Sequence, residues 1–321
     1  MEISPTIAGQ IVRACDEAQR IVIISHRNPD ADSIGSNLAL RQLLESMGKN
    51  VISACVDIVP KELGFLPNVT TFQTSFDLNA TDLMICVDAG SIPQTGFLDR
   101  QPEIFESKKP IINIDHHPSN HGYGSINLII ADAASTTLVI YNLFKLLGVI
   151  ITPQIATCLL CGLYYDTGSF MHSNVCDEVY QTASELMSAG ADFCSIVKNM
   201  YKNRSIEQLK TWGKILEGMK VTPNNVVVSG ITQKELDACC ASTVETSGII
   251  DYLSTVKDAE FATLLVEDDK GSVRGSFRTR KNEINLSEMA GMFGGGGHKK
   301  ASGFNLPGVL QKETVWTIKP E

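Results

Sequence analysis

Acidic and histidine side chains gather at four places in the N-terminal part of the sequence. They are the segment His26–Asp32, the single residue Asp88, the triplet Asp115–His117 and the single residue Asp166. Mixed sets of carboxylates and imidazoles suit Mn²⁺, Fe²⁺, Co²⁺ or Zn²⁺, whereas carboxylates alone favour Mg²⁺ or Mn²⁺. Two catalytic metal ions about 4 Å apart need one bridging carboxylate and several terminal ligands. A lone aspartate usually caps a turn, but capping does not explain so many such residues together, so the sequence predicts a metal site.

Buried strands are predicted directly before the first three of these places. Short apolar runs cover 21–24, 51–56, 83–87 and 111–114, and helical patterns cover 5–19, 33–47, 134–147, 153–163, 177–189 and 205–219. Strands that alternate with helices predict a parallel sheet with helical crossovers. Ligands of such sheets bind beyond the carboxyl ends of the strands, so the first three places should meet at one edge. Asp166 is predicted to lie in a loop after the helix at 153–163.

The pattern changes after about residue 220. Strands are predicted at 226–228, 262–266 and 273–277, and the turn 267–271 should join the last two as a hairpin. A polar stretch near 190–205 marks a domain boundary. We therefore predict an α/β protein with an N-terminal parallel-sheet domain at 1–190, a linker at 191–204 and a smaller C-terminal α/β domain at 205–321.

A glycine run, Gly294–Gly297, stands out in the second domain. Four consecutive glycines cost too much backbone entropy for a packed helix interior. Their N–H groups can cradle an anion, and the following His298 favours this interpretation over a flexible linker. Arg278 and Arg280 follow a predicted strand, and arginine suits bidentate contact with phosphate. The C-terminal domain is thus predicted to bind an anion.

The overall composition narrows the classes of function. The 321 residues are 43% hydrophobic and 20% charged, which is typical of a globular protein. No apolar run reaches the ~18 residues of a membrane span, and no signal-peptide pattern opens the sequence, so we expect no membrane partner. The net charge of −9 disfavours long duplex nucleic acid, whereas short anionic ligands suit a site where metals offset that charge. Nine cysteines at irregular spacing favour a cytoplasmic location.

These motifs, taken together, resemble the DHH phosphoesterase superfamily over nearly the whole chain. The matching residues are His26-x-x-Pro29-Asp30-x-Asp32-x-x-Gly35-Ser36, Val87-Asp88, Asp115-His116-His117-Pro118-x-Asn120 and Asp166-Thr167-Gly168. The later run Gly294-Gly295-Gly296-Gly297-His298-x-x-Ala301-Ser302-Gly303 resembles the signature of the associated DHHA1 substrate-binding domain.

The resemblance implies two divalent metal ions, typically Mn²⁺, with Mg²⁺ or Co²⁺ as alternatives. One ion would be held by His26, Asp30 and Asp88, and the other by Asp32, Asp88, His116 and Asp166. Asp88 would bridge the two ions, His117 would lie near the scissile phosphate, and Asp115 would orient the imidazoles. Substrate would be bound by Arg278, Gly295, Gly296, Gly297 and His298. His172 is a loop histidine that could border the same site.

Several branches of the superfamily share these metal motifs. Family II inorganic pyrophosphatases carry another type of C-terminal domain, RecJ-type exonucleases carry added nucleic-acid-binding domains, and membrane-bound cyclic-dinucleotide phosphodiesterases carry transmembrane regions. The sequence is most similar to the nanoRNase and pAp phosphatase branch. That branch hydrolyses short oligonucleotides (nanoRNA, pApA) to mononucleotides and pAp to AMP and phosphate, and its members are commonly homodimers. The alternatives left open are cyclic-dinucleotide hydrolysis, RecJ-type exonuclease activity, pyrophosphate hydrolysis and a catalytically silent nucleotide sensor.

Overall fold

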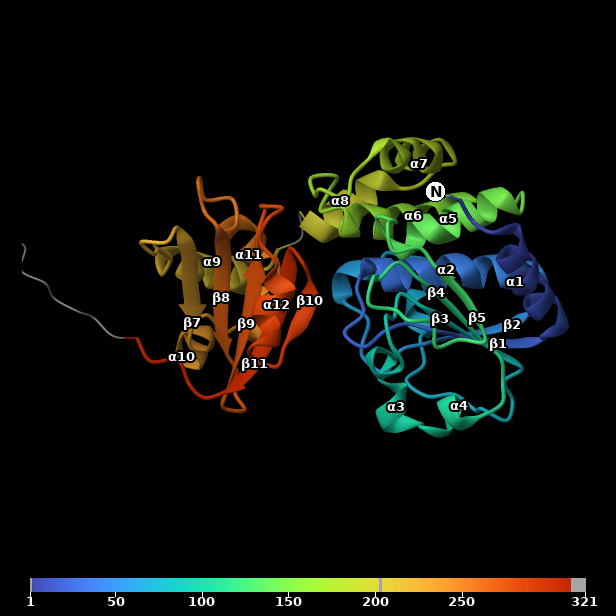
Figure 1. Ribbon diagram of the computed structural model, residues 1–321, viewed down its shortest axis with the longest axis horizontal. Helices are drawn as coiled ribbons and strands as arrows, with labels where there is room; N and C mark the ends of the chain where they lie inside the picture. The colour runs from blue at the N-terminus through green and yellow to red at the C-terminus, as the bar shows by residue number, and fades with distance from the viewer. Residues whose placement is uncertain (1, 202–203, 313–321) are drawn as a thin grey trace, which may run out of the picture. The chain divides into compact units, whose positions relative to one another are not determined.

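The computed structural model describes residues 2–201 and 204–312. The chain divides into two compact units, Met1–Asn203 and Arg204–Glu321 (Figure 1). A helix, α8 (Phe193–Tyr201), occupies most of the segment 191–204 that was expected to be a linker. Residues 202–203 of that segment and 313–321 of the expected second domain lie outside the described residues.

Unit 1 is built on a five-stranded sheet with the strand order β2-β1-β3-β4-β5. The strands are β1 (Arg20–Ile24), β2 (Asn50–Ala54), β3 (Leu83–Val87), β4 (Ile111–Asp115) and β5 (Ile126–Ile129). All neighbouring strands pair in parallel, which confirms the predicted sheet. The edge strand β5 was not predicted, because it has only four residues, one of them is polar and only one of them is buried.

Helices cover both faces of this sheet (Figure 1). The helices and 3₁₀ turns of unit 1 besides α8 are α1 (Pro5–Glu17), α2 (Ala31–Ser46), η1 (Lys61–Leu63), η2 (Val69–Thr71), η3 (Ile92–Thr95), α3 (Phe97–Arg100), α4 (Glu103–Glu106), α5 (Thr136–Leu146), α6 (Pro153–Asp166) and α7 (Asp177–Ser188). Alternate residues of β1 divide between two cores: Ile21 and Ile23 pack with α2, α5 and α6, whereas Val22 and Ile24 pack with residues of α3 and α4. Burial on both faces explains the continuous apolar runs of the strands.

Unit 2 is built on a six-stranded sheet with the strand order β10-β11-β9-β8-β7-β6. The strands are β6 (Lys220–Val221), β7 (Val226–Ile231), β8 (Phe261–Glu267), β9 (Ser272–Arg278), β10 (Gly296–His298) and β11 (Ala301–Pro307). Only β7 and β8 pair in parallel among the described strands of this sheet. The hairpin of β8 and β9 is the one that the sequence predicts.

The two faces of the second sheet carry different helices. The helical segments of unit 2 are α9 (Ile206–Glu217), α10 (Gln233–Ala238), η4 (Thr243–Thr246), α11 (Ile249–Leu253) and α12 (Leu286–Gly291). Residues of α9, α10 and α11 form a core with Ala262, Leu264 and Val266 of β8. Residues of α12 form another with Phe277 of β9 and Phe304 of β11, on the opposite face.

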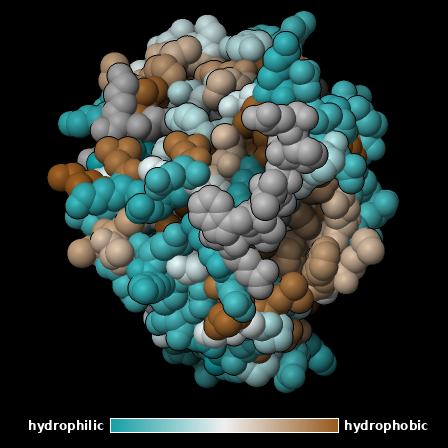
Figure 2. Space-filling model, turned by 90° about the vertical axis from the view of Figure 1, so that its left-hand side faces the viewer, coloured by the Kyte–Doolittle hydropathy of each residue, from teal (hydrophilic) through white to brown (hydrophobic). Residues whose placement is uncertain are grey.

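Across 2–201 and 204–312, no helix is both long enough and apolar enough to cross a membrane. On the face seen in Figure 2, hydrophobic and hydrophilic residues are interspersed. All nine cysteines are free.

Candidate active site

The loop after β1 supplies the first two site residues, His26 and Asp30. Asp30 is the N-cap of α2, and its Oδ1 accepts hydrogen bonds from the backbone N–H of Asp32 and Ser33, each at 3.0 Å. The Nδ1 of His26 lies 2.7 Å from the carbonyl oxygen of Arg27, which can only accept, so Nδ1 carries a hydrogen. The Nε2 of His26 therefore faces the acids, 3.7 Å from Asp30 Oδ1 and 3.3 Å from Asp88 Oδ2.

Asp88, directly after β3, lies at the centre of the cluster. Its backbone φ of 56° is in the left-handed region, which is uncommon for a residue other than glycine, although aspartate adopts it more readily than most. The backbone N–H bonds the carbonyl of Ile114 at 3.0 Å, and the hydroxyl of Thr136 donates to Oδ1 at 2.9 Å. Asp88 is buried, and its Oδ1 lies 3.6 Å from His116 Nε2 and 3.7 Å from His117 Nδ1.

The end of β4 presents two adjacent imidazoles in different ways. His116 Nδ1 donates to the carbonyl of Ala133 at 3.1 Å, which leaves Nε2 facing Asp88 and Asp166. His117 instead directs Nδ1 to Asp115 Oδ1, at 2.7 Å. The two neighbours thus differ in orientation: the Nε2 of His116 faces the acids, whereas the Nδ1 of His117 is held by a carboxylate.

Asp115 is held at both oxygens by protein donors. Oδ1 accepts from the backbone N–H of His116 at 2.8 Å as well as from the His117 ring, and Oδ2 accepts from the Asn120 amide at 2.6 Å. Asp115 is fully buried. This arrangement fits the expected orienting role, although the carboxylate contacts the backbone of His116 and the ring of His117.

Two glycines allow α2 and α6 to approach closely and so bring Asp32 to Asp166. A Cβ at Gly35 would overlap the carbonyl of Cys158, and a Cβ at Gly162 would lie 2.7 Å from Asp32 Oδ1. The helix predicted at 153–163 continues to Asp166, so the expectation of a loop at this residue is wrong. The added turn directs Asp166 Oδ2 to His116 Nε2, at 3.2 Å.

The first turn of α5 anchors the cluster through residues that sequence pattern alone did not single out. Asp32 accepts hydrogen bonds from the backbone N–H of Thr136 at 2.6 Å and Thr137 at 2.9 Å, and from the Thr137 hydroxyl at 2.6 Å. Thr136 also donates to Asp88. The three hydroxyls of Ser135-Thr136-Thr137, at the start of a predicted helix, were the signal that could have identified this anchor.

Crowding of acids makes the cluster electrostatically unusual. Burial raises the pKa of Asp166 to about 6, although the hydrogen bond to His116 opposes this shift. Burial, together with repulsion from Asp88 and Asp166, raises the pKa of Asp32 well above its usual value. Burial lowers the pKa of a histidine, but hydrogen bonds to the acids outweigh it and raise the pKa of His26 and His116 well above the usual range. A divalent cation would offset this concentration of negative charge.

Three groups of these side chains could hold a metal ion. The ligand atoms in each group lie within 4.8 Å of one another, and the groups are His26, Asp30 and Asp88; Asp32, His116 and Asp166; and Asp88, His116 and His117. Asp88 belongs to the group with His26 and Asp30 and to the group with His116 and His117, whereas the group of Asp32, His116 and Asp166 does not include it. The donor set of carboxylate oxygens and imidazole nitrogens fits a first-row divalent ion.

The residues predicted in the C-terminal domain lie together within unit 2. Ala301 pairs with Arg278 on one side and with His298 on the other, so the three share a row and a face of the sheet. Arg278 Nε lies 2.7 Å from Asp251 Oδ1 of α11. The row thus presents a guanidinium and an imidazole two strands apart.

The glycine run forms ordered structure. Gly294, with φ of 72°, turns the chain after α12, and Gly296 and Gly297 belong to β10. A Cβ at Gly295 would overlap the carbonyl of Gly303, and a Cβ at Gly297 would lie 2.6 Å from the carbonyl of Ala301. Close packing or backbone conformation therefore requires glycine at 294, 295 and 297, and the interpretation as a flexible linker is wrong.

His172 lies at the border of the acid cluster. Its Nδ1 is 3.3 Å from the carbonyl of Asp166, and its ring packs over Gly168. The side chain is exposed. Its place matches the expectation of a loop histidine beside the site.

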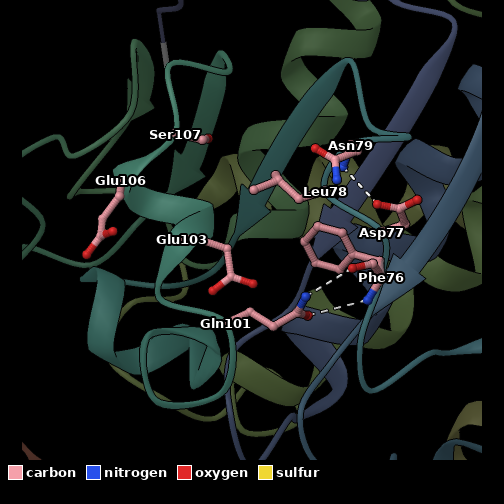
Figure 3. A pocket seen from close by; sticks show the side chains of 8 residues that line it. All are labelled: Phe76, Asp77, Leu78, Asn79, Gln101, Glu103, Glu106 and Ser107. Atoms are coloured by element: carbon pink, nitrogen blue, oxygen red, sulfur yellow. Dashed lines mark hydrogen bonds between the residues drawn. The ribbon is translucent and has the colours of Figure 1, made fainter.

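A pocket of about 490 Å³ in unit 1 is separate from this cluster (Figure 3). Its lining residues are Phe76, Asp77, Leu78, Asn79, Gln101, Glu103, Glu106 and Ser107. They precede β3 and β4 and so lie near the amino ends of these strands, away from the carboxyl edge. The Gln101 side chain bonds the backbone N–H and carbonyl of Phe76 at 3.4 and 3.0 Å. Because its charged lining is acidic, this pocket does not suit a phosphate ester.

Comparison with known families gives two matches, one in unit 1 and one in unit 2. Residues 20–163 match the model described as "DHH family, N-terminal domain", and residues 228–316 match the model described as "DHHA1 domain". The first match contains most of the acid and histidine cluster, and the second contains β8, β9, β10 and β11.

Curated relatives match over most of both chains. The bifunctional oligoribonuclease and PAP phosphatase NrnA of Thermus thermophilus is 27% identical over 90% of this chain and 85% of its own. The protein of the same name from Mycoplasma genitalium is 27% identical over 92% of this chain and 91% of its own. A solved structure, an exopolyphosphatase-related protein from Bacteroides fragilis, has 25% identity and a TM-score of 0.89, covering 96% of this chain and 93% of its own. With a DHH domain followed by a DHHA1 domain, this chain is a phosphoesterase of the DHH/DHHA1 superfamily.

Proposed function

We propose that the protein is a two-metal phosphoesterase that hydrolyses short oligonucleotides to mononucleotides and pAp to AMP and phosphate. One ion is assigned to His26, Asp30 and Asp88, and the other to Asp32, Asp88, His116 and Asp166. The observation that carries this proposal is the position of Asp88 between two imidazoles, 3.3 Å from His26 Nε2 and 3.6 Å from His116 Nε2. Mn²⁺ is the ion that the family resemblance implies, and the mixed nitrogen and oxygen donors suit it along with other first-row divalent ions. Such ions lower the pKa of water and neutralise phosphoryl charge.

His117 is assigned to the reacting phosphate. Asp115 holds its Nδ1, so Nε2 is the atom that can donate a hydrogen bond or a proton to a phosphoryl or leaving-group oxygen. Burial lowers the pKa of His117, but the hydrogen bond to Asp115 and the nearby Asp88 outweigh it, so the pKa is raised. The side chain is 21% exposed, which leaves a path to substrate. The raised pKa favours the protonated form that an acid catalyst requires.

The C-terminal unit is assigned to substrate binding. Arg278 and His298, together with the backbone of Gly295, Gly296 and Gly297, would bind a substrate phosphate. The shared sheet row of Arg278 and His298 supports this assignment. The names of the curated relatives support oligoribonucleotides and pAp as substrates. Nine free cysteines fit a reducing cytoplasm as the place of reaction.

A panel of substrates tests this proposal. The protein is assayed with Mn²⁺ against pAp, pApA, a 5-mer RNA, a 24-mer RNA, cyclic di-AMP and pyrophosphate, and the products are separated by chromatography. We expect AMP and phosphate from pAp and mononucleotides from pApA and the 5-mer. The Asp88→Asn variant is the matched control and should release neither.

Each other outcome identifies a different member of the superfamily. Turnover restricted to cyclic di-AMP, to the 24-mer or to pyrophosphate would reject the proposed substrates and leave the metal assignment standing. Nucleotide binding without turnover of any substrate would identify a sensor and reject the catalytic role.

A further inference from the structure

A second pocket, of about 430 Å³, lies within unit 2 and has no part in the function proposed above. Its polar lining side chains are Thr243, Asp268, Arg274, Ser276 and Asn305. The volume falls in the range of small-molecule sites. The pocket lies over β9 and β11, the two strands next to the glycine-rich β10.

The pocket shares a sheet face with the residues assigned to phosphate binding. On β9, Val273, Gly275 and Phe277 are buried, and the alternate residues, Arg274 among them, project from the other face. Arg278 is four residues further along the same strand as Arg274, or about 13 Å at 3.3 Å per residue. Both arginines therefore point to one side of the sheet.

The register of β11 continues this face. Asn305 pairs with Arg274, Gly303 with Ser276, and Ala301 with Arg278. Gly303 pairs with Ser276 in the row between Arg274 and Arg278, and it contributes no side chain to that row. On these two strands, Ser276 is the side chain that stands between the Arg274 row and the Arg278 row.

The charges in the pocket favour a nucleoside over a second phosphate. Asp268, which lines the same pocket as Arg274, accepts hydrogen bonds from the backbone N–H of Lys270 and Ser272 at 2.9 and 2.8 Å. Arg274 Nη2 is also 3.4 Å from the Thr246 hydroxyl of η4. One positive and one negative charge cancel, so the pocket has no excess charge to attract a dianion.

The remaining groups suit a base edge and ribose hydroxyls. Asn305 offers an amide donor and acceptor, and Thr243 and Ser276 offer hydroxyls that can donate or accept. Side chains of these types read the edges of unpaired bases in single-stranded RNA. A ligand that contacts both Arg278 and Arg274 would place a phosphate at Arg278 and the adjoining nucleoside in the pocket at Arg274 and Asn305.

We propose that this pocket is a nucleoside subsite that receives the neighbouring residue of a short oligonucleotide when its phosphate is held at Arg278 and His298. The inference rests on the proposed function and deepens it. A mononucleotide such as pAp has no second nucleoside to place there, whereas a 5-mer RNA has. Arg274 and Asn305 therefore set the preference for oligonucleotides relative to pAp.

Steady-state kinetics of two variants test the subsite. KM and kcat are measured for pAp and for a 5-mer RNA with the wild type, Arg274→Ala and Asn305→Ala. We expect each variant to raise the ratio of KM for the 5-mer to KM for pAp by about tenfold, the loss of roughly one polar contact. Lys234→Ala, an exposed lysine of α10 outside the pocket, is the matched control and should leave the ratio unchanged.

The outcomes separate the subsite from the proposed function. An unchanged ratio, or an equal rise of KM for both substrates in a variant that melts like the wild type, rejects the subsite. If the wild type hydrolyses neither substrate, the proposed function fails, and anisotropy of a labelled 5-mer then tests the pocket directly. Weaker binding by Arg274→Ala than by Lys234→Ala would support it, and equal binding would reject it.

Discussion

Asp88 lies between the imidazoles of His26 and His116. It combines a left-handed backbone, a fixed hydrogen bond from Thr136 and two facing imidazoles. Asp88→Asn keeps the size of the side chain but removes the negative charge. We expect kcat/KM for pApA to fall by roughly a hundredfold or more, on the scale of losing one preorganised electrostatic contact.

Arg278→Ala is the comparison for that variant. Since Arg278 is assigned to substrate binding, the change should act mainly on KM. Steady-state kinetics on pApA distinguish the two, and an equal loss in the same kinetic parameter would contradict the division of roles.

The adjacent histidines permit a second comparison at the residue scale. His116→Ala removes an Nε2 that faces Asp88 and Asp166, so Mn²⁺ affinity should fall by about tenfold to a hundredfold. His117→Ala should lower kcat and leave Mn²⁺ affinity close to that of the wild type. Isothermal titration with Mn²⁺ measures the first effect and the pApA assay the second. Similar Mn²⁺ affinities for the two variants would refute the assignment.

The titration of the cluster predicts how metal and pH act together on stability. The folded pKa of Asp166, about 6, is above its usual 3.8, so the metal-free fold loses stability as pH rises from about 3.8 to about 6 and carries the full cost of the ionised carboxyl at higher pH. The raised pKa of His26 and His116 acts in the same direction, because the stabilising imidazolium charge is lost as pH rises through the folded value. Mn²⁺ offsets the acids, so it should raise Tm more at pH 8 than at pH 5.5. Thermal melting with and without Mn²⁺ measures this, and a larger shift at pH 5.5 would contradict it.

At the scale of elements, the site depends on how closely α2 and α6 pack. Gly162 lies against Asp32, and an added Cβ would be 2.5 Å from the Thr137 side chain and 2.8 Å from Asp32 Cα. Gly162→Ala should therefore lower the free energy of unfolding by about 1–3 kcal/mol and weaken Mn²⁺ binding, because α2 must move. Urea unfolding and Mn²⁺ titration measure the two effects.

The matched control is Gly9→Ala. Gly9 is an exposed position in α1 with nothing within 4 Å of an added Cβ. Alanine there should raise the free energy of unfolding by about 0.5–1 kcal/mol through helix propensity and leave Mn²⁺ binding alone. If both variants behaved alike, the steric argument at Gly162 would be wrong.

Local sequence pattern predicted some of the strands and helices correctly and missed others. The buried strands β1, β3 and β4 were predicted because fully buried parallel strands read as short apolar runs. β10 and β11 were missed, because glycines dominate one and interrupt the other, and pairing with β9 rather than propensity holds them in the sheet. The end of α6 was misplaced by three residues, since tertiary contacts extend the helix to Asp166.

At the scale of the whole molecule, we expect the net charge of −9 to disfavour long nucleic-acid substrates. Each additional phosphate adds repulsion, and the metal ions can offset charge only locally. We expect kcat/KM for a 2-mer RNA to exceed that for a 24-mer by about tenfold or more. An assay of both at equal concentration measures this, and comparable turnover would contradict it. Homodimer formation, which the resemblance to the family implies, stays a prediction.

Local sequence pattern was sufficient to predict the chemistry of the ligands, the sheet edge at which they gather and the order of the two domains. Motif spacing and strand periodicity are local properties, so the sequence alone predicted that residues such as His26, Asp88 and His116 lie together at one edge of the sheet. The anchoring contacts of Thr136 depend instead on the tertiary fold, because this residue bonds Asp88, 48 residues away, and Asp32, 104 residues away. Such contacts are absent from local pattern, since the packing of distant helices against a shared sheet sets which polar groups meet.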